Sequence, residues 1–191
     1  MTMGKELSEM TLEELWELFP IFLVEHNENW NAYYRELEDS LHIILSGCHV
    51  DRISHIGSTA IPGIWAKNIM DVLIEVSPSE DIKKVANIME QSGFIIMSAG
   101  TQRISLNKGY TKEGVADKVY HIHLRYTGDN DELYFRDYLN EHPDVAKEYE
   151  ALKLNLWKEY KHNRDAYTKA KTDFVQKWTQ EALKKYGNRY C

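Results

Sequence analysis

The chain is 191 residues long and carries a formal net charge of -7, with 43% hydrophobic and 28% charged residues. This length suits one domain, and the apolar content suffices for a packed core, which excludes a wholly disordered chain. The sequence has no run of about 18 apolar residues, which excludes a membrane-spanning helix.

The negative charge is concentrated in the first quarter of the chain. Residues 1–50 carry 2 basic and 10 acidic side chains, whereas the remainder is close to neutral. A protein that binds nucleic acid normally presents a basic face, so we expect no strong nucleic-acid surface. Residues 1–10 lack the pattern of a secretory signal, and Cys48 and Cys191 form no metal-binding pair. Both observations favour a cytoplasmic protein.

The spacing of apolar residues predicts the elements of the first half of the chain. Pro20 and Gly47 each follow an amphipathic stretch, as residues that end helices commonly do. In chain order, we expect a helix over 12–19, a strand over 21–25, a helix over 30–45, a strand over 53–56, a turn-rich stretch over 57–63 and a strand over 69–76.

In the second half of the chain, strands give way to helices. We expect a helix over 79–91 with Ser79 as its N-cap, strands over 94–97, 103–107 and 119–126, and a loop over 108–118. From about residue 131 to the end, the pattern is almost wholly helical. The sequence therefore predicts a single α+β domain over residues 1–191, with a helical C-terminal part over about 131–191.

A turn-rich segment carries the clearest chemical signal. A strand that ends in Gly57-Ser58-Thr59 exposes backbone N–H groups and two hydroxyls, which are suited to phosphate oxygens. Lys67 adds a positive charge for the same anion. The alternative is an ordinary surface loop, because Gly, Ser and Pro also favour such loops.

Two acidic residues follow on the next predicted strand. Asp71 and Glu75 are four residues apart and so share one face of that strand. Two carboxylates beside a phosphate-binding turn predict a Mg²⁺ site. Asp71 is the strongest candidate, because an acid among apolar neighbours is costly to bury unless it is paired. For Glu75, near the strand end, a solvent-facing position is the alternative.

The run HIGSTAIPGIWAKNIMDVLIEV, followed downstream by HIHL and FRDYLNEHPDVAKEYEALK, resembles the GrpB family of the nucleotidyltransferase superfamily. The resemblance extends over roughly residues 12–180. It implies a mixed sheet flanked by helices. It also implies carboxylates that hold metal ions and position a nucleoside triphosphate. Gly57 and Ser58 match the Gly-Ser turn of the superfamily, and Asp71 matches one acid of its Asp-x-Asp pair.

The sequence departs from the superfamily pattern at the other acids. Ile69 and Leu73 occupy the two positions at which the second acid of the pair would stand. His121-Ile122-His123 stands in place of a clear later carboxylate. These departures favour a mechanism other than two-metal nucleotidyl transfer, or a loss of catalysis.

Two histidines share one face of the strand predicted over 119–126. His121 and His123 are candidate catalytic residues and are suited to bind Zn²⁺ or a phosphate. Arg125 stands where a histidine-triad hydrolase would have its third histidine, which excludes that arrangement. We expect the histidines to line the pocket, with Arg103 and Arg125 as anion partners; a structural role is the alternative.

Basic residues of the helical part complete the predicted site. Arg136, Lys153 and Lys171 are candidates to close the pocket from the helical side, although charge on a helix is usually a solvated face. The tryptophans are better explained as core and interface residues, and Trp65 alone, in the turn-rich segment, could face a ligand.

The sequence thus predicts a nucleotidyltransferase-like protein that binds a nucleotide or another phosphorylated small molecule. With Mg²⁺, it would transfer a nucleotidyl or phosphoryl group. The alternative is a catalytically inactive ligand-binding or regulatory domain of the same fold. No oligomeric state is predicted.

Overall fold

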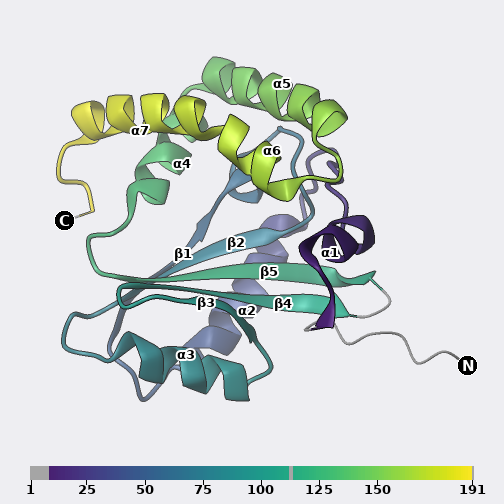
Figure 1. The fold of residues 1–191 in the computed structure, drawn as a ribbon. Helices are drawn as coiled ribbons and strands as arrows, with labels where there is room; N and C mark the ends of the chain where they lie inside the picture. Colours follow the sequence, from purple (N-terminus) through teal and green to yellow (C-terminus); the bar gives the residue numbers. More distant parts are fainter. Residues whose placement is uncertain (1–8, 112–113, 191) are drawn as a thin grey trace, which may run out of the picture.

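A five-stranded mixed sheet forms the centre of the computed structural model, which describes residues 9–111 and 114–190 (Figure 1). The strand order is β1-β2-β5-β4-β3, and β2 and β5 are the parallel pair. The other neighbouring strands are antiparallel. The α+β class and the mixed sheet are therefore confirmed. Cys191 and most of the stretch considered for a secretory signal lie outside the described residues.

Four of the five strands extend further than their apolar patterns predict, and β2 agrees with its prediction to within one residue. They are β1 (Val50–Ile56), β2 (Met70–Val76), β3 (Ile95–Ala99), β4 (Arg103–Thr111) and β5 (Gly114–Tyr126). The predicted loop over 108–118 is wrong in its described part, because β4 and β5 continue as a hairpin in which Tyr110 pairs with Val115. This stretch contains three Lys and two Gly among its eleven residues, so it carries too little apolar alternation to predict a strand.

Helices account for most of the remaining chain. They are α1 (Leu12–Leu18), α2 (Trp30–Ile44), α3 (Ile82–Gln91), α4 (Asp131–Glu141), α5 (Pro143–Glu159), α6 (Arg164–Ala170) and α7 (Thr172–Tyr186). Helix α3 begins later than predicted. Its N-cap is Asp81, which accepts a hydrogen bond from the Lys83 N–H, and not Ser79.

The predicted strand over 21–25 is also wrong. In this segment Val24 alone forms a bridge, exchanging backbone hydrogen bonds of 2.8 and 3.0 Å with Ala66. The apolar side chains that suggested a strand are buried against helices instead. Ile21 and Leu23 pack with Leu156 and Tyr167.

The two faces of the sheet are covered by different helices. Helices α2 and α3 lie on one face, and α4 to α7 lie on the other (Figure 1). Alternate residues of the central strands, such as Val72 and Ile122, are buried in the core under α2 and α3. Because side chains alternate along a strand, the residues between them face α4 to α7. This alternation turns Asp71, His121 and His123 toward the C-terminal helices.

Within residues 9–111 and 114–190, every helix is too short or too polar to cross a membrane.

Candidate functional site

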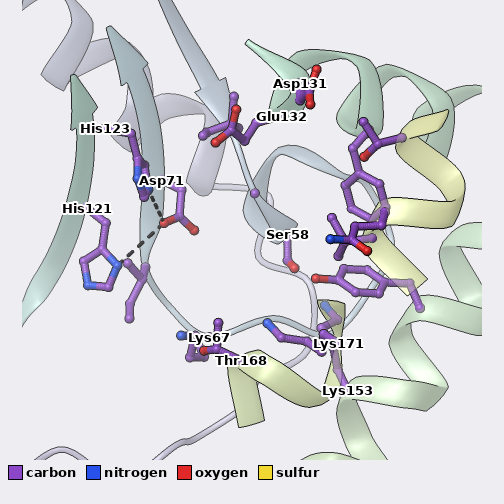
Figure 2. Close-up of a pocket in the computed structure, with 18 of the residues that line it drawn as sticks. Ser58, Lys67, Asp71, His121, His123, Asp131, Glu132, Lys153, Thr168 and Lys171 are labelled. Atoms are coloured by element: carbon purple, nitrogen blue, oxygen red, sulfur yellow. Dashed lines mark hydrogen bonds and ion pairs between the residues drawn. The ribbon is translucent and has the colours of Figure 1, made fainter. Parts of the chain in front are cut away.

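A cavity of about 650 Å³ lies between the sheet and the C-terminal helices (Figure 2). Its volume is in the range of small-molecule binding sites. The structure brings most of the residues predicted from the sequence to this cavity: Gly57, Ser58, Lys67, Asp71, Arg103, His121, His123, Lys153 and Lys171.

Gly57 and Asp71 meet where β1 and β2 pair. Ile56 is the antiparallel partner of Asp71, so the chain turns beside the carboxylate at Gly57. Gly57 has a φ of 70°, and a Cβ there would lie 2.5 Å from Asp71 Oδ2. Only glycine fits this backbone conformation and this spacing without strain. The backbone at Gly57 therefore packs directly against the Asp71 side chain.

The parallel pairing of β2 and β5 places both histidines beside Asp71. His121 is the direct partner of Asp71 in the register. Asp71 Oδ1 lies 3.6 Å from His121 Nδ1 and 3.3 Å from His123 Nε2. Burial raises the pKa of Asp71, but the hydrogen bonds and charges of the two imidazoles outweigh burial and hold that pKa well below its usual range. Asp71 is therefore an ionised carboxylate at neutral pH.

Tyr110 and Arg164 form a hydrogen-bonded chain to the His121 ring nitrogen that does not face Asp71. The Tyr110 hydroxyl lies 2.7 Å from His121 Nε2 and accepts a 3.4 Å hydrogen bond from Arg164 Nη1. Both ring nitrogens of His121 thus face protein groups. Tyr110 gives no signal of a site in the sequence, since the pattern around it predicts a loop.

Three lysines from separate segments line the cavity opposite Asp71, and we call Lys67, Lys153 and Lys171 the lysine wall (Figure 2). Burial and, to a lesser extent, the nearby charge of Lys171 lower the pKa of Lys153 to about 7. Burial likewise lowers the pKa of Lys67 and of Lys171 to about 8. The lysine wall is thus a concentration of positive charge that its surroundings disfavour.

Two tyrosines that the sequence analysis did not single out support the cavity. The Tyr149 hydroxyl of α5 forms a hydrogen bond with the Ser58 side chain, and burial raises the pKa of Tyr149 to about 12. The Tyr167 ring lies 4.5 Å from Lys171 Nζ and 5.9 Å from Lys67 Nζ. Both residues lie on apolar helical stripes, a pattern that indicates a core position and gives no sign of a site.

Glu75 does not line the cavity, which corrects its prediction as a catalytic residue and metal ligand. It does share the Asp71 face of β2, but it is 1% exposed. Its Oε2 lies 3.2 Å from Arg52 Nη1, and its Oε1 accepts a 2.8 Å hydrogen bond from Asn130 Nδ2. Glu75 is therefore a buried structural acid.

Two predicted phosphate ligands are also engaged elsewhere. The Thr59 hydroxyl is buried and donates to the Ile69 carbonyl at 3.2 Å. Arg136 donates to the His55 carbonyl at 2.9 Å and to Asp137 at 2.7 Å. Neither residue lines the cavity, because a local backbone or carboxylate acceptor satisfies each of them.

Two arginines, Arg103 at the start of β4 and Arg125 near the end of β5, are paired with acids. Arg103 reaches the cavity but forms a bidentate ion pair with Asp129, at 2.6 and 2.7 Å. Arg125 lies 3.8 Å from Asp129 and from Glu132 and does not line the cavity. Trp65 packs against the cluster of Ile21 and Leu156, in agreement with the core interpretation of the tryptophans.

The described residues do not form a preorganised metal site. No group of three or more His, Cys, Asp or Glu among them is arranged to hold an ion. Asp71 is the one acid of the predicted pair at the cavity, and its Oδ1 faces two imidazoles. The donor set therefore differs from the paired carboxylates that a two-metal centre requires.

Comparison with known proteins identifies relatives across nearly the whole chain. The family model for GrpB protein matches residues 20–181. Glutamate-rich protein GrpB of Alkalihalophilus pseudofirmus is 36% identical over 170 residues, which cover 84% of this chain and 95% of that protein. YqkA of Bacillus subtilis is 30% identical over 92% of this chain, which spans only 51% of YqkA.

Solved structures agree on the fold. The crystal structure of conserved protein GrpB from Enterococcus faecalis matches with a TM-score of 0.73 and 32% identity, covering 86% of this chain and 99% of that chain. Cid1 in complex with the UTP analog UMPNPP matches with a TM-score of 0.51 and 11% identity, covering 83% and 50%. Cid1 is a poly(U) polymerase. This likeness concerns the fold alone and confirms a nucleotidyltransferase-like architecture.

Proposed function

This chain belongs to the GrpB family, and we propose that it binds a nucleotide or another phosphorylated small molecule in the cavity beside Asp71. We further propose that it transfers a nucleotidyl or phosphoryl group from that ligand. The observation that carries the proposal is the juxtaposition of Ser58, Asp71 and the lysine wall around one cavity of about 650 Å³. A cytoplasmic location belongs to the same proposal, and the free thiol of Cys48 supports it.

In this proposal, each group at the cavity has a distinct task. The lysine wall neutralises the phosphates, and the Ser58 hydroxyl donates to a phosphate oxygen. Asp71 holds His121 and His123 in fixed orientations through its Oδ1. Among the described residues, His123 bonds through Nε2 alone, so its Nδ1 is left to accept or deliver a proton at the ligand.

Ligand-dependent stabilisation tests the binding part of the proposal. We would measure thermal unfolding against a panel of nucleotides and phosphorylated metabolites, each with and without Mg²⁺ or Mn²⁺. A ligand at about 100 times its dissociation constant stabilises the folded state by about 2.7 kcal/mol. The proposal predicts such a shift for at least one phosphorylated compound, and it fails if the whole panel leaves the transition unmoved.

Transfer is tested with labelled nucleoside triphosphates. Transfer of a label from the α-phosphate to an acceptor indicates nucleotidyl transfer. Transfer of a label from the γ-phosphate indicates phosphoryl transfer. Asp71→Asn should abolish either signal, because it removes the charge that orients both histidines. Asp39→Asn is the matched control, since Asp39 is an exposed acid on α2.

The second candidate is a catalytically inactive ligand-binding or regulatory domain of the same fold. The presence of a single carboxylate where the superfamily pattern has a pair favours it. This candidate predicts stabilisation by a phosphorylated ligand that is independent of a divalent cation and is not accompanied by transfer of either label.

A further inference from the structure

The lysine wall carries more positive charge than a single phosphate group neutralises. Its side chains come from the segment before β2, from α5 and from the end of α6, and they reach the same cavity (Figure 2). On the premise of the proposed function, we infer that the lysine wall binds two or more linked phosphates of one ligand and does so without a divalent cation.

The lysines of the wall lack the partners that other lysines of this protein have. Lys84, Lys184 and Lys185 lie 2.6–3.1 Å from carboxylate oxygens on the surface. Within the described ranges, no ammonium group of the lysine wall lies within 4.0 Å of a carboxylate. Buried charges in proteins are usually paired, whereas here Lys153 is buried and Lys67 and Lys171 are half-buried, all without a carboxylate partner among the described residues. A bound anion would supply such a partner.

Aromatic rings and one carbonyl hold these ammonium groups in place. Lys153 is 2% exposed, and its Nζ donates to the Trp65 carbonyl and lies 4.9 Å from the Tyr149 ring. Lys67 and Lys171 flank the Tyr167 ring. These contacts orient the lysines toward the cavity, but a ring face attracts a cation far less strongly than an anion does. The lysine wall is therefore preorganised for an anion, because its contacts orient the ammonium groups without neutralising their charge.

The charge of the lysine wall sets the class of ligand. A phosphate monoester carries about -1.5 to -2 charges at neutral pH. Three ammonium groups exceed this charge. Arg103 and Arg164 also line the cavity, as do five carboxylates, of which Asp129 pairs with Arg103 and Asp71 faces the two histidines. A ligand with two or three linked phosphates supplies the additional negative charge, and a cavity of about 650 Å³ admits it.

Protons should accompany this ligand. The charged or titratable groups that act on the lysine wall are Glu150 and Tyr149 from α5, Arg164 and Tyr167 from α6, and Asp71 from β2. Burial lowers the pKa of each lysine to about 7 or 8, and the charge of Lys171 contributes to the shift at Lys67 and Lys153. Part of the population is therefore neutral at pH 8. An oligophosphate favours the charged form, and its binding should therefore take up protons.

Calorimetry with inorganic phosphates tests this inference directly. The intact protein would be titrated at pH 7 in EDTA with orthophosphate, pyrophosphate and tripolyphosphate. We expect affinity to rise by about tenfold or more from orthophosphate to tripolyphosphate. Titrations in buffers of different ionisation enthalpy should show proton uptake.

Substitutions in the lysine wall locate the effect. Lys171→Met should weaken tripolyphosphate binding by about tenfold or more, and Lys153→Met should do the same while reducing proton uptake. Lys184→Met, at an exposed lysine of α7 that is paired with Glu181, should bind as the wild type does. Circular dichroism would establish that each variant is folded, and the two wall variants provide independent tests.

The outcomes separate this inference from the proposed function. Equal affinity for orthophosphate and tripolyphosphate, or tripolyphosphate binding only after Mg²⁺ is added, would overturn the inference and leave the proposed function standing. Unchanged binding in both wall variants would also overturn it. Failure of every nucleotide and phosphate to bind would overturn both.

Discussion

The carboxylate of Asp71 lies where a side chain on Gly57 would begin. A Cβ at residue 57 would be 2.5 Å from Asp71 Oδ2 and 2.9 Å from Asp71 Cβ. The antiparallel pairing of β1 and β2 fixes this contact, since Ile56 is the register partner of Asp71. The turn that ends β1 and the acid of β2 are therefore one structural unit at the cavity.

Gly57→Ala should destabilise the protein and also impair ligand binding. The added Cβ meets the Asp71 carboxylate and also places alanine at a positive φ, together costing about 2–4 kcal/mol. Gly63→Ala is a matched control, because Gly63 has a φ of 71° and open space around its Cβ position. Urea unfolding should show a clearly smaller loss for Gly63→Ala. Equal losses would mean that the contact with Asp71 is unimportant.

Asp71→Asn should reveal the electrostatic role of the acid. Because the folded-state pKa of Asp71 is lowered, its ionised form stabilises the fold above the unfolded pKa of about 3.9. That stability is lost as the pH falls through the folded-state pKa. We expect the variant to be about 1–3 kcal/mol less stable than the wild type at pH 6. In urea unfolding, this difference should shrink below pH 4; a difference independent of pH would contradict this account.

The lysine wall should make stability rise with pH. Each of its lysines has a folded-state pKa of about 7 or 8, below the value of 10.5 for an unperturbed lysine. Between pH 7 and pH 10 the folded state therefore releases protons that the unfolded state retains, which favours folding. Lys153→Met should reduce the rise by about 1 kcal/mol or more. Lys184→Met should retain the wild-type slope in denaturant titrations across this range.

Glu75→Gln should lower the stability of the protein and leave its affinity for phosphorylated ligands unchanged. The substitution removes the charge that faces Arg52 in a buried pair, and breaking such a pair costs about 3–5 kcal/mol. Since Glu75 does not line the cavity, the folded variant should bind phosphorylated ligands with wild-type affinity. A selective loss of affinity in a folded Glu75→Gln would restore Glu75 as a site residue.

Local patterns predict the turn and the acid because these features are near neighbours in sequence. Gly57 and Ser58 follow a short apolar run, and Asp71 interrupts another, so composition alone marks both. Alternation also correctly places Glu75 on the Asp71 face of the strand. It cannot show where along that face the cavity ends, because the position of Asn130 and Arg52 over Glu75 is a tertiary property.

Long-range pairing determines the rest of the site. The contact of Asp71 with His121 depends on the parallel register of β2 and β5, which are separated by about forty residues of chain. The periodicity of α5 and α6 marks Tyr149 and Tyr167 as core residues and gives no sign that they also border a cavity. The Tyr110 contact with His121 likewise requires the β4–β5 hairpin, for which the sequence pattern predicts a loop.

A crystal structure of the protein with its most stabilising phosphorylated ligand tests the central claim most directly. We predict ligand phosphates between the Ser58 hydroxyl and the ammonium groups of Lys67 and Lys171, with Asp71 and the histidines facing the adjacent atoms. A ligand whose phosphates lie outside this cavity, with the lysine wall uncontacted, would contradict the account.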